Sequence, residues 1–269
     1  MIEIIPEIDK IEEYAELAEK YALGFEYNDF FNPDLLDDKA AIRERISRYR
    51  QLGRPQKTDT MHGAFYDIVP FSWDSGISSH SRYRMQQSAE IAAELGCRAV
   101  IFHAGLRPQF AGSEKYYRNW LETMSRLAEQ LAAQWDVEIY YENMEETSPA
   151  ELGELADSLR GESRFGICLD VAHMMLTGGS SPEEWFQRLA DQIRHFHFND
   201  NHLKRDEHLA LGCGDINWQE IFEKIRRYGL QDASMLLEVS GLQKTTLSLE
   251  YLEKAGICHE CSGNLFTDR

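Results

Sequence analysis

Short apolar runs that each end in one histidine or acidic residue recur along this chain of 269 residues. The most complete run covers residues 165–169, and it is followed by Asp170 and, three residues later, by His173. Continuous apolar runs of this length are typical of parallel strands, which are buried on both faces. We therefore expect Asp170 to emerge at the carboxyl end of a buried strand and His173 to lie on the loop just beyond it.

The same pattern occurs five more times. These runs cover residues 58–62, 99–103, 137–142, 195–197 and 235–238, and they end in His62, His103, Glu142, His197 and Glu238. Residues 1–6 and 24–27 are expected to form two further strands, before the first of these runs. The chain thus predicts eight strands, of which the last six each deliver one potential metal ligand at the same end.

Segments with helical periodicity separate the strands. Apolar side chains at three-and-four spacing predict helices over residues 8–22, 39–52, 82–95, from Ser113 onward, from Asn217 to Gly229, and over residues 245–254. Capping-box signatures with proline at the first helical position predict helix starts at Ser148 and Ser181. Residues 28–38, which are rich in aspartate, and the aromatic stretch after His62 (Phe65, Tyr66, Phe71 and Trp73) are expected to be loops.

Eight strands alternating with helices favour a parallel sheet, and eight such units favour a single (β/α)₈ TIM barrel over residues 1–269. A doubly wound open sheet is the alternative architecture. An open sheet would not gather the ends of six successive strands around one centre, whereas a closed barrel does so at its mouth. We therefore predict the α/β barrel.

Composition narrows the class of partner. The chain has 28 basic and 46 acidic residues, a formal net charge of −18, which disfavours nucleic acid because that affinity depends on Lys and Arg neutralising phosphates. Five scattered cysteines fit free thiols better than a disulfide framework, and the Cys258–Cys261 pair is expected to be incidental. We expect a cytoplasmic protein without a membrane span.

The strand ends carry the chemistry. In a barrel the six terminal residues would point into one mouth, and a cluster of carboxylates there needs cations to neutralise it. Mixed His, Asp and Glu ligands suit zinc, manganese, cobalt or non-haem iron. His173, Asp206 and His208 are further candidates on adjoining loops, with Asp206 and His208 expected on one side of an extended segment.

The ordered motifs are similar to those of the xylose isomerase-like TIM-barrel superfamily. That superfamily includes sugar and sugar-phosphate isomerases and epimerases, inosose dehydratases and the apurinic endonucleases (family 2) that use three zinc ions. The resemblance covers nearly the whole chain and rests on the segments MHG at 61–63, FHAG at 102–105, YEN at 141–143, LDVAH at 169–173, HFNDN at 197–201 and DEHLALGCGDINW at 206–218.

The resemblance implies two ligand sets. The isomerase pattern implies metal ligands at Glu142, Asp170, His197 and Glu238, with Glu142 and Glu238 exchanging protons with the substrate while His173 contacts the substrate or a second metal. The endonuclease pattern adds His62, His103, His173, Asp206 and His208. One to three divalent ions, zinc or manganese, are therefore expected per chain.

The favoured function from the sequence is a metal-dependent isomerase or epimerase of a small sugar, polyol or sugar phosphate. A phosphodiester hydrolase with three zinc ions and an inosose-type dehydratase are the alternatives. Arg107, Lys204 and Arg205 are the cations expected near the mouth, and Arg107 and Arg205, together with His173, are candidate substrate contacts. Nucleic acid is disfavoured as a partner on this interpretation, and a homo-oligomer is left open.

Overall fold

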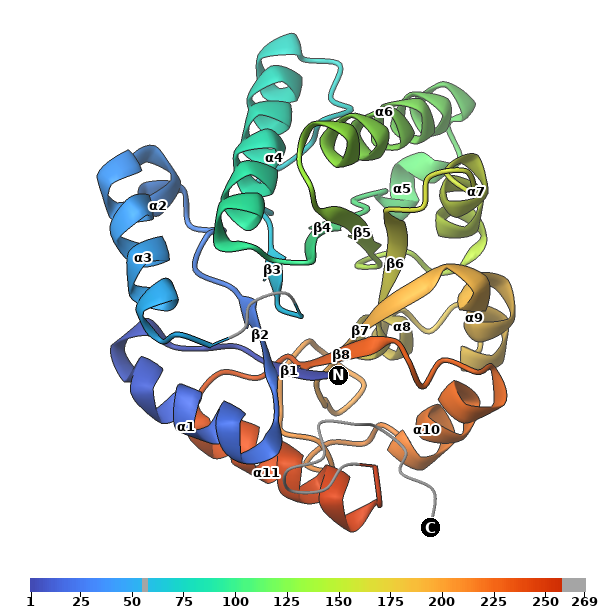
Figure 1. The fold of residues 1–269 in the computed structure, drawn as a ribbon. Coiled ribbons are helices and arrows are strands. Elements are labelled where there is room, and N and C mark those ends of the chain that lie inside the picture. The colour runs from blue at the N-terminus through green and yellow to red at the C-terminus, as the bar shows by residue number, and fades with distance from the viewer. Residues whose placement is uncertain (55–57, 258–269) are drawn as a thin grey trace.

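The computed structural model describes residues 1–54 and 58–257. Its eight strands form one closed, all-parallel barrel in the order β1 to β8, surrounded by helices (Figure 1). The closing contact pairs β1 with β8, where Ile2, Glu3 and Ile4 lie beside residues 235–237. The predicted (β/α)₈ barrel is confirmed, and the open-sheet alternative is wrong.

All eight predicted strands are present. Their bounds are β1 Ile2–Ile4, β2 Gly24–Tyr27, β3 Thr60–His62, β4 Ala99–His103, β5 Glu138–Glu142, β6 Phe165–Asp170, β7 Ile193–Phe198 and β8 Ser234–Leu237. Strands β2, β4 and β6 have the predicted bounds, whereas the other five differ by one or two residues at one end or both. At the ends that carry candidate ligands, β7 continues one residue past His197 and β8 stops just before Glu238. Differences of this size do not move a side chain away from the strand end.

The helices follow the strands around the barrel. They are α1 Ile11–Tyr21, α2 Pro33–Asp37, α3 Lys39–Gln51, α4 Ser75–Leu95, α5 Pro108–Ala111, α6 Glu114–Gln134, α7 Ala150–Ser158, α8 Val171–Thr177, α9 Pro182–Leu189, α10 Trp218–Arg227 and α11 Leu242–Lys254, with 3₁₀ turns at Ile8–Lys10 and Ala190–Gln192. Gly53, Gly96 and Gly229 follow α3, α4 and α10 with positive φ, as expected of glycine at a helix end.

Several helix predictions were wrong in extent. The expected loop at 28–38 contains α2, which Asn32 caps by accepting the Asp34 N–H. Helix α4 begins at Ser75, seven residues before the predicted start, because the Asp74 carboxylate accepts the N–H groups of Gly76 and Ile77. The aromatic loop after His62 is correspondingly shorter. Helix α11 begins at Leu242 rather than at residue 245, and α5 was not predicted.

The two capping boxes differ. At Ser181 the box is complete, because its hydroxyl accepts the Glu184 N–H while the Glu184 carboxylate accepts the Ser181 N–H. At Ser148 the prediction was wrong in register, since α7 begins one residue later with Pro149 as the cap. The Ser148 hydroxyl instead donates to the Glu151 carboxylate at 2.8 Å.

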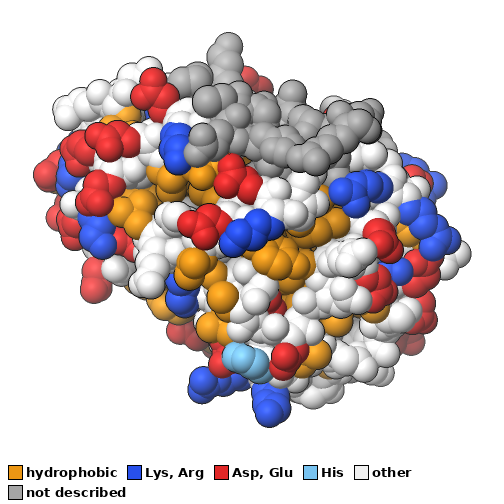
Figure 2. Space-filling model, turned by 90° about the horizontal axis from the view of Figure 1, so that it is seen from below, with side chains coloured by type: hydrophobic (Ala, Val, Ile, Leu, Met, Phe, Trp, Pro, Cys, Tyr) orange, Lys and Arg blue, Asp and Glu red, His pale blue; other side chains and the backbone are white. Residues whose placement is uncertain are grey.

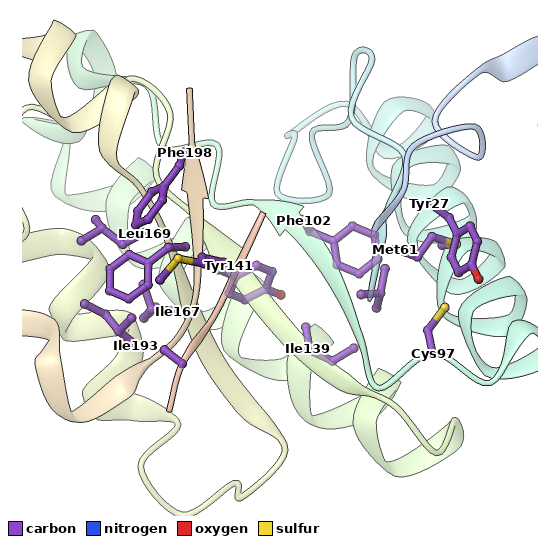
Figure 3. Close-up of a cluster of buried hydrophobic side chains, with 14 of the residues drawn as sticks. Tyr27, Met61, Cys97, Phe102, Ile139, Tyr141, Ile167, Leu169, Ile193 and Phe198 are labelled. Carbon is purple, nitrogen blue, oxygen red and sulfur yellow. The ribbon is translucent and has the colours of Figure 1, made fainter. Parts of the chain in front are cut away.

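Alternation along each strand divides the residues between two layers. Met61, Phe102, Tyr141, Leu169 and Phe198 belong to the large apolar layer between strands and helices (Figure 3). A much smaller apolar cluster of Ala99, Ile101, Tyr140 and Cys168 comes from the other parity and fills part of the barrel interior. Every strand-end candidate ligand shares this second parity, so the hydrophobic core and the site are built from different faces of the same strands.

The surface agrees with a strongly acidic chain. On the face in Figure 2, acidic and basic side chains of the described residues are interspersed with small apolar patches rather than gathered into a basic surface. Within residues 1–54 and 58–257, no helix combines the length and apolar character needed to cross a membrane. The Cys258–Cys261 pair lies outside the described residues, while Cys97, Cys168 and Cys213 are free thiols.

Candidate metal centre

The six strand-end residues meet at the carboxyl-terminal mouth of the barrel. Asp170 and His197 are fully buried, Glu142 is 1% exposed, and His62 and Glu238 are buried as well. His103 is partly exposed at the edge of the cluster. Strands β3 to β8 therefore bring together the six residues that the sequence predicted to converge, although whether they bind metal stays a prediction.

Glu142 lies at the centre of this cluster. Its Oε2 is 3.2 Å from His62 Nε2 and 3.7 Å from His103 Nε2, while its Oε1 is 3.3 Å from His197 Nδ1 and 3.5 Å from His173 Nδ1. Each carboxylate oxygen thus faces a different set of imidazoles. This arrangement suits a carboxylate that bridges two cations, because the two oxygens point to two groups of donors.

Four residues form the largest donor group among the described residues. One ligand atom from each of Glu142, Asp170, His197 and Glu238 lies within 4.8 Å of the other three. Asp170 Oδ2 and His197 Nδ1 are buried in this group and have no hydrogen-bond partner among the described residues. Buried polar atoms without partners are costly, and a cation is the partner that a carboxylate oxygen and an imidazole nitrogen share. These residues therefore fit a divalent metal.

A second donor group shares Glu142. His62, His103 and Glu142 also place one ligand atom each within 4.8 Å of one another. His62 Nδ1 lies 2.9 Å from the Gly63 carbonyl, an outer contact that orients the ring and directs Nε2 toward Glu142. Two imidazoles and a carboxylate form a ligand set that zinc commonly accepts.

His173, Asp206 and His208 extend the cluster on its outer side. His173 was expected on a loop, but it lies in α8, whose start is capped by Asp170 accepting the His173 N–H at 2.6 Å. His173 Nε2 lies 3.5 Å from Asp206 Oδ2, and the same oxygen lies 2.8 Å from His208 Nε2. The structure therefore brings all nine candidate ligands into one connected cluster.

The segment carrying Asp206 and His208 is not extended, contrary to the prediction. His208 has φ +44°, so a local bend rather than strand alternation brings its ring to Asp206. The loop is folded around the buried Asp200, whose carboxylate accepts N–H groups from Gly212 and Ile216 and from the Trp218 indole. Asp200 and Leu209 also form an antiparallel bridge.

Burial and crowding set the charges in the cluster. Burial, with the charges of Glu238 and Glu142 adding to it, raises the pKa of Asp170 to about 8. Burial alone would also raise the pKa of Glu142, but the charge of His197 and the nearby imidazoles of His173 and His62 hold it well below its ordinary value. Burial lowers the pKa of His103 to about 3. Protons therefore occupy some of these positions in the absence of a cation.

Outer residues that the sequence analysis did not single out hold the ligands in place. The Asn143 side chain donates to the Asp170 carbonyl at 2.9 Å and accepts the Asp170 N–H at 2.8 Å. Asn199 donates to Glu238 Oε2 at 3.1 Å, and Glu26 lies 3.4 Å from His197 Nε2. Asn143 and Asn199 stand one and two residues after a predicted ligand, which was the available signal. For Glu26 the signal was an acid inside a short apolar strand.

A cavity of about 250 Å³ opens beside the cluster at His103. Most of its lining residues are apolar, and Arg107, Asp67 and Glu145 are its charged lining residues. Arg107 therefore lines a cavity that reaches the cluster at His103, and its contact with a substrate stays a prediction. Arg205 is different, because its exposed side chain lies 3.2 Å from Glu207 and is engaged there.

Most aspartates of the stretch at 28–38 have partners within the fold. Asp29 lies 2.7 Å from Arg45, and Asp37 lies 2.6 Å from Arg84. Asp38 caps α3 by accepting the N–H groups of Ala40 and Ala41. Three aspartates of this stretch are consequently paired with arginines or used as a helix cap within the fold.

The barrel and its cluster define an enzyme class in which divalent ions are usual. The chain belongs to the xylose isomerase-like TIM barrel family, whose model matches residues 15–255. The resemblance inferred from the sequence is thereby confirmed at the level of the family.

Two known proteins are each 27% identical to part of this chain. An uncharacterized protein, MJ1311, of Methanocaldococcus jannaschii is 27% identical over 205 residues, which cover 72% of this chain and 68% of that protein. A probable endonuclease 4 of Mycobacterium leprae is 27% identical over 176 residues, covering 61% of this chain and 67% of that protein.

Among solved structures, the TTHB071 protein of Thermus thermophilus, soaked with ZnCl₂, has a TM-score of 0.72 and 24% identity, with 94% and 96% of the two chains covered. The 3-keto-D-glucoside 4-epimerase YcjR of E. coli has a TM-score of 0.68 and 18% identity, with 96% and 99% covered. At these identities the structures establish the shared fold.

Proposed function

We propose that this protein is a metal-dependent isomerase or epimerase of a small sugar, polyol or sugar phosphate. The observation that carries the proposal is that Glu142 and Glu238 both approach the same nitrogen of His197. Their Oε1 atoms lie 3.3 Å and 3.7 Å from His197 Nδ1, and the two glutamates stand at the end of β5 and just after β8. Two carboxylates from different strands in one ligand group can act on two faces of a substrate bound between them.

Glu142, Asp170, His197 and Glu238 would hold the metal, which when bound polarises the carbonyl and hydroxyl oxygens of the substrate. One glutamate removes a proton from the carbon next to the carbonyl, and the other returns a proton from the opposite side. The Asn199 side chain holds Glu238 at 3.1 Å and restricts the direction in which its carboxylate points. His173 contacts the substrate oxygens from the outer side of the group.

The surroundings fit the rest of a carbohydrate. Phe65 stacks on His103 with ring centroids 5.1 Å apart, and Phe31 stacks on Phe65 at 4.8 Å. Tyr66 is 55% exposed beside them, so an aromatic surface flanks the cluster on one side. Such a surface packs against the C–H face of a sugar ring, while Arg107 in the neighbouring cavity can bind a phosphate or carboxylate.

A hydrolase of phosphodiesters is the second candidate. The observation in its favour is that Glu142 joins the four-residue group to His62 and His103, with Asp206 and His208 beyond His173. The isomerase pattern implies four of these nine ligands, whereas the endonuclease pattern, with three zinc ions, implies all nine. The probable endonuclease 4 among the relatives fits this alternative. The net charge of −18 weighs against a duplex DNA substrate.

Metal content separates the two candidates first. Asp170→Asn should remove the metal of the four-residue group while the barrel still folds, because this residue lies outside the apolar layer between strands and helices. His62→Ala should lower the number of metals by one if the second group is filled, and should leave it unchanged if one metal suffices. His80→Ala is the matched control, since His80 is exposed on α4 away from the cluster.

Turnover then decides the reaction. We expect metal-dependent conversion of at least one member of a panel of ketoses, aldoses and inososes, with deuterium from the solvent entering a carbon position. Loss of turnover in Glu142→Gln and Glu238→Gln should accompany it. Metal-dependent nicking of abasic DNA, with no turnover across the panel, would instead establish the hydrolase.

A further inference from the structure

The barrel interior below the metal centre is unusually polar. TIM-barrel interiors are mostly filled by branched apolar side chains. Here Glu3, Glu26, Thr60, His195 and Ser234 occupy inward positions on β1, β2, β3, β7 and β8, and all are buried, with Glu3, Glu26 and His195 fully enclosed. Burying an unpaired carboxylate lowers the stability of a protein by roughly several kcal/mol. The polar layer therefore needs a function that offsets this cost.

The backbone makes room for this layer. Gly24 pairs with Glu3 across β1 and β2, and a Cβ at Gly24 would lie 2.8 Å from Glu3 Cγ. Arg98 reaches the layer from below, with Nη2 3.5 Å from Glu3 Oε1 and 2.6 Å from Ser234 Oγ. The fold thus accommodates the layer, with a glycine that leaves space and a cation beside one of the two acids.

The hydrogen bonds give the layer a direction. Thr60 Oγ1 lies 2.5 Å from Glu3 Oε2 and 2.9 Å from Glu26 Oε2, but a hydroxyl has one hydrogen to donate. Both contacts are satisfied at once when one carboxyl group is protonated and donates to Thr60. Glu26 has further donors in His195 and His197, whereas burial raises the pKa of Glu3 to about 8, so the proton fits Glu3 and the Thr60 hydrogen fits Glu26.

Donors among the described residues then converge on one oxygen of Glu26. Besides Thr60, the rings of His195 and His197 place Nε2 at 3.2 Å and 3.4 Å from Glu26 Oε2. Ser234 Oγ lies 2.6 Å from His195 Nδ1, so the hydroxyl can donate there while it accepts from Arg98. This set of contacts is consistent when Glu26 is a carboxylate and both rings carry their proton on Nε2.

These contacts determine the state of the other ring nitrogen of His197, Nδ1. With Nε2–H directed at Glu26, the Nδ1 lone pair points into the group formed with Glu142, Asp170 and Glu238, where it has no hydrogen-bond partner among the described residues. Metal-binding histidines characteristically donate their second N–H to a carboxylate, which fixes both ring orientation and tautomer.

We propose that Glu26 is the positioning residue of the metal centre, acting through His197. It touches neither metal nor substrate; its carboxylate holds His197 with Nδ1 available as a ligand. The inference rests on the proposed four-residue site, and it explains why an acid lies inside β2. A second buried cation in the Glu3, Glu26 and His195 group is a poorer explanation, because Glu26 Oε2 and His195 Nε2 already face each other at 3.2 Å.

Glu26→Gln tests the inference, and Glu3→Gln is its matched control. Both acids are buried in the same layer and contact Thr60, but only Glu26 contacts His197. Glutamine closely resembles the protonated form of Glu3, so Glu3→Gln should keep wild-type zinc affinity. Glu26→Gln removes the charge that holds His197, and we expect zinc affinity to fall about 10- to 100-fold in competition with a chromophoric chelator.

Cobalt substitution supplies a second measurement, the absorption spectrum of the bound ion, which general destabilisation of the fold would not change. In cobalt-substituted protein the absorption bands of the four-residue group should change in Glu26→Gln and stay unchanged in Glu3→Gln. If Glu26→Gln does not fold, Glu26→Asp retains the charge but withdraws the oxygen from His197, and it should show the same direction of change.

Asp170→Asn separates this inference from the proposed site. Loss of zinc in Asp170→Asn together with unchanged affinity and spectrum in the Glu26 variants would overturn the role of Glu26 and leave the site standing. Retention of zinc in Asp170→Asn would overturn the four-residue site itself. Equal losses in Glu26→Gln and Glu3→Gln would show that the layer acts only through stability, which would also refute the proposal.

Discussion

Glu146 is a titrating residue just beyond the metal centre. It is 4% exposed, its Oε2 accepts the Met144 N–H at 2.6 Å, and its Oε1 has no partner among the described residues. Burial raises the pKa of Glu146 to about 7, against the opposing backbone hydrogen bonds and the charge of His173. A neutral carboxylic acid in the folded state therefore becomes charged within the physiological range of pH.

Stability should depend on pH through this residue. The unfolded chain loses the Glu146 proton near its ordinary pKa of 4.5, whereas the folded state retains it until about 7. The unfolded state is therefore favoured progressively as pH rises from 5 to 8, by at most about 3 kcal/mol. Glu146→Gln cannot ionise, so we expect its unfolding free energy relative to wild type to increase over this interval.

Urea denaturation of metal-free protein at several pH values measures this difference. The neighbour Glu145 supplies the control, because Glu145→Gln makes the same substitution at an exposed side chain. A constant gap between Glu146→Gln and wild type from pH 5 to pH 8 would contradict the prediction.

At the scale of single residues, the sequence singled out the candidate ligands but not the residues that hold them in place. Each of the six strand-end candidate ligands follows an apolar run, so strand periodicity was enough to propose it. Asn143, Asn199 and Glu26 act through hydrogen bonds across strands, and periodicity carries no information on such contacts. The local conformation of His208 was also missed, because a positive φ outside glycine has no reliable sequence signal.

Among the elements, the loop between β7 and α10 depends on close backbone packing. Gly214 lies against Asp200 and Asn201, and a Cβ at Gly214 would overlap with Asp200 Oδ1 and with the Asn201 carbonyl. Asp200 organises the loop that carries Asp206 and His208, so crowding at Gly214 reaches the outer side of the cluster.

We expect Gly214→Ala to lower the unfolding free energy by about 1–3 kcal/mol and to weaken any metal held by Asp206 and His208. Metal in the four-residue group should remain. Gly161→Ala is the control, because nothing lies within 4 Å of a Cβ at that position. Equal stability of the two variants in thermal or urea unfolding would show that the loop accommodates the methyl group.

Element boundaries were predicted most accurately where the local sequence signals were strongest. Strand β2 was predicted without error, and the Ser181 capping box gave the start of α9. The start of α4 was missed because residues 75–81 are mostly polar and lack an apolar stripe, leaving Asp74 as the only marker. Helix α8 was overlooked because it spans only residues 171–177 and directly continues β6.

On the scale of the whole molecule, the metal centre joins much of the barrel. Its six strand-end candidate ligands lie at the ends of β3, β4, β5, β6, β7 and β8, so a bound ion connects strands that are far apart in sequence. A ligand that binds only the folded state stabilises it by mass action, by about 2.7 kcal/mol when present at 100 times its Kd. For a chain of this length that corresponds to roughly 5 °C in Tm.

Removing metal with a chelator should therefore lower Tm, and adding zinc back should restore it. Differential scanning calorimetry of chelated and zinc-loaded protein measures the shift. In Asp170→Asn the difference in Tm between chelated and zinc-loaded protein should be much smaller, because the four-residue group has lost a ligand. A Tm of the wild-type protein that is independent of zinc would argue against the centre.

The overall architecture was predictable because closure of the barrel follows from counting strands and from the shared position of their terminal residues. Net charge was a weaker guide to the mouth. A charge count treats Asp29 and Asp37 as free charges, but they are paired with Arg45 and Arg84 from other helices. Pairing of this kind depends on tertiary contacts and cannot be read from a charge count.

The position of Glu142 between two donor groups has a thermodynamic consequence. If both groups bind metal, each ion alters the affinity of the other by the same factor, since linkage between sites is reciprocal. The first ion would align the shared carboxylate for the second ion, but the two positive charges would also repel each other. The enclosed group with three carboxylates should fill first, and the edge position at His103 should exchange fastest. A zinc titration would then show two unequal steps, and one substitution at Glu142 would change both.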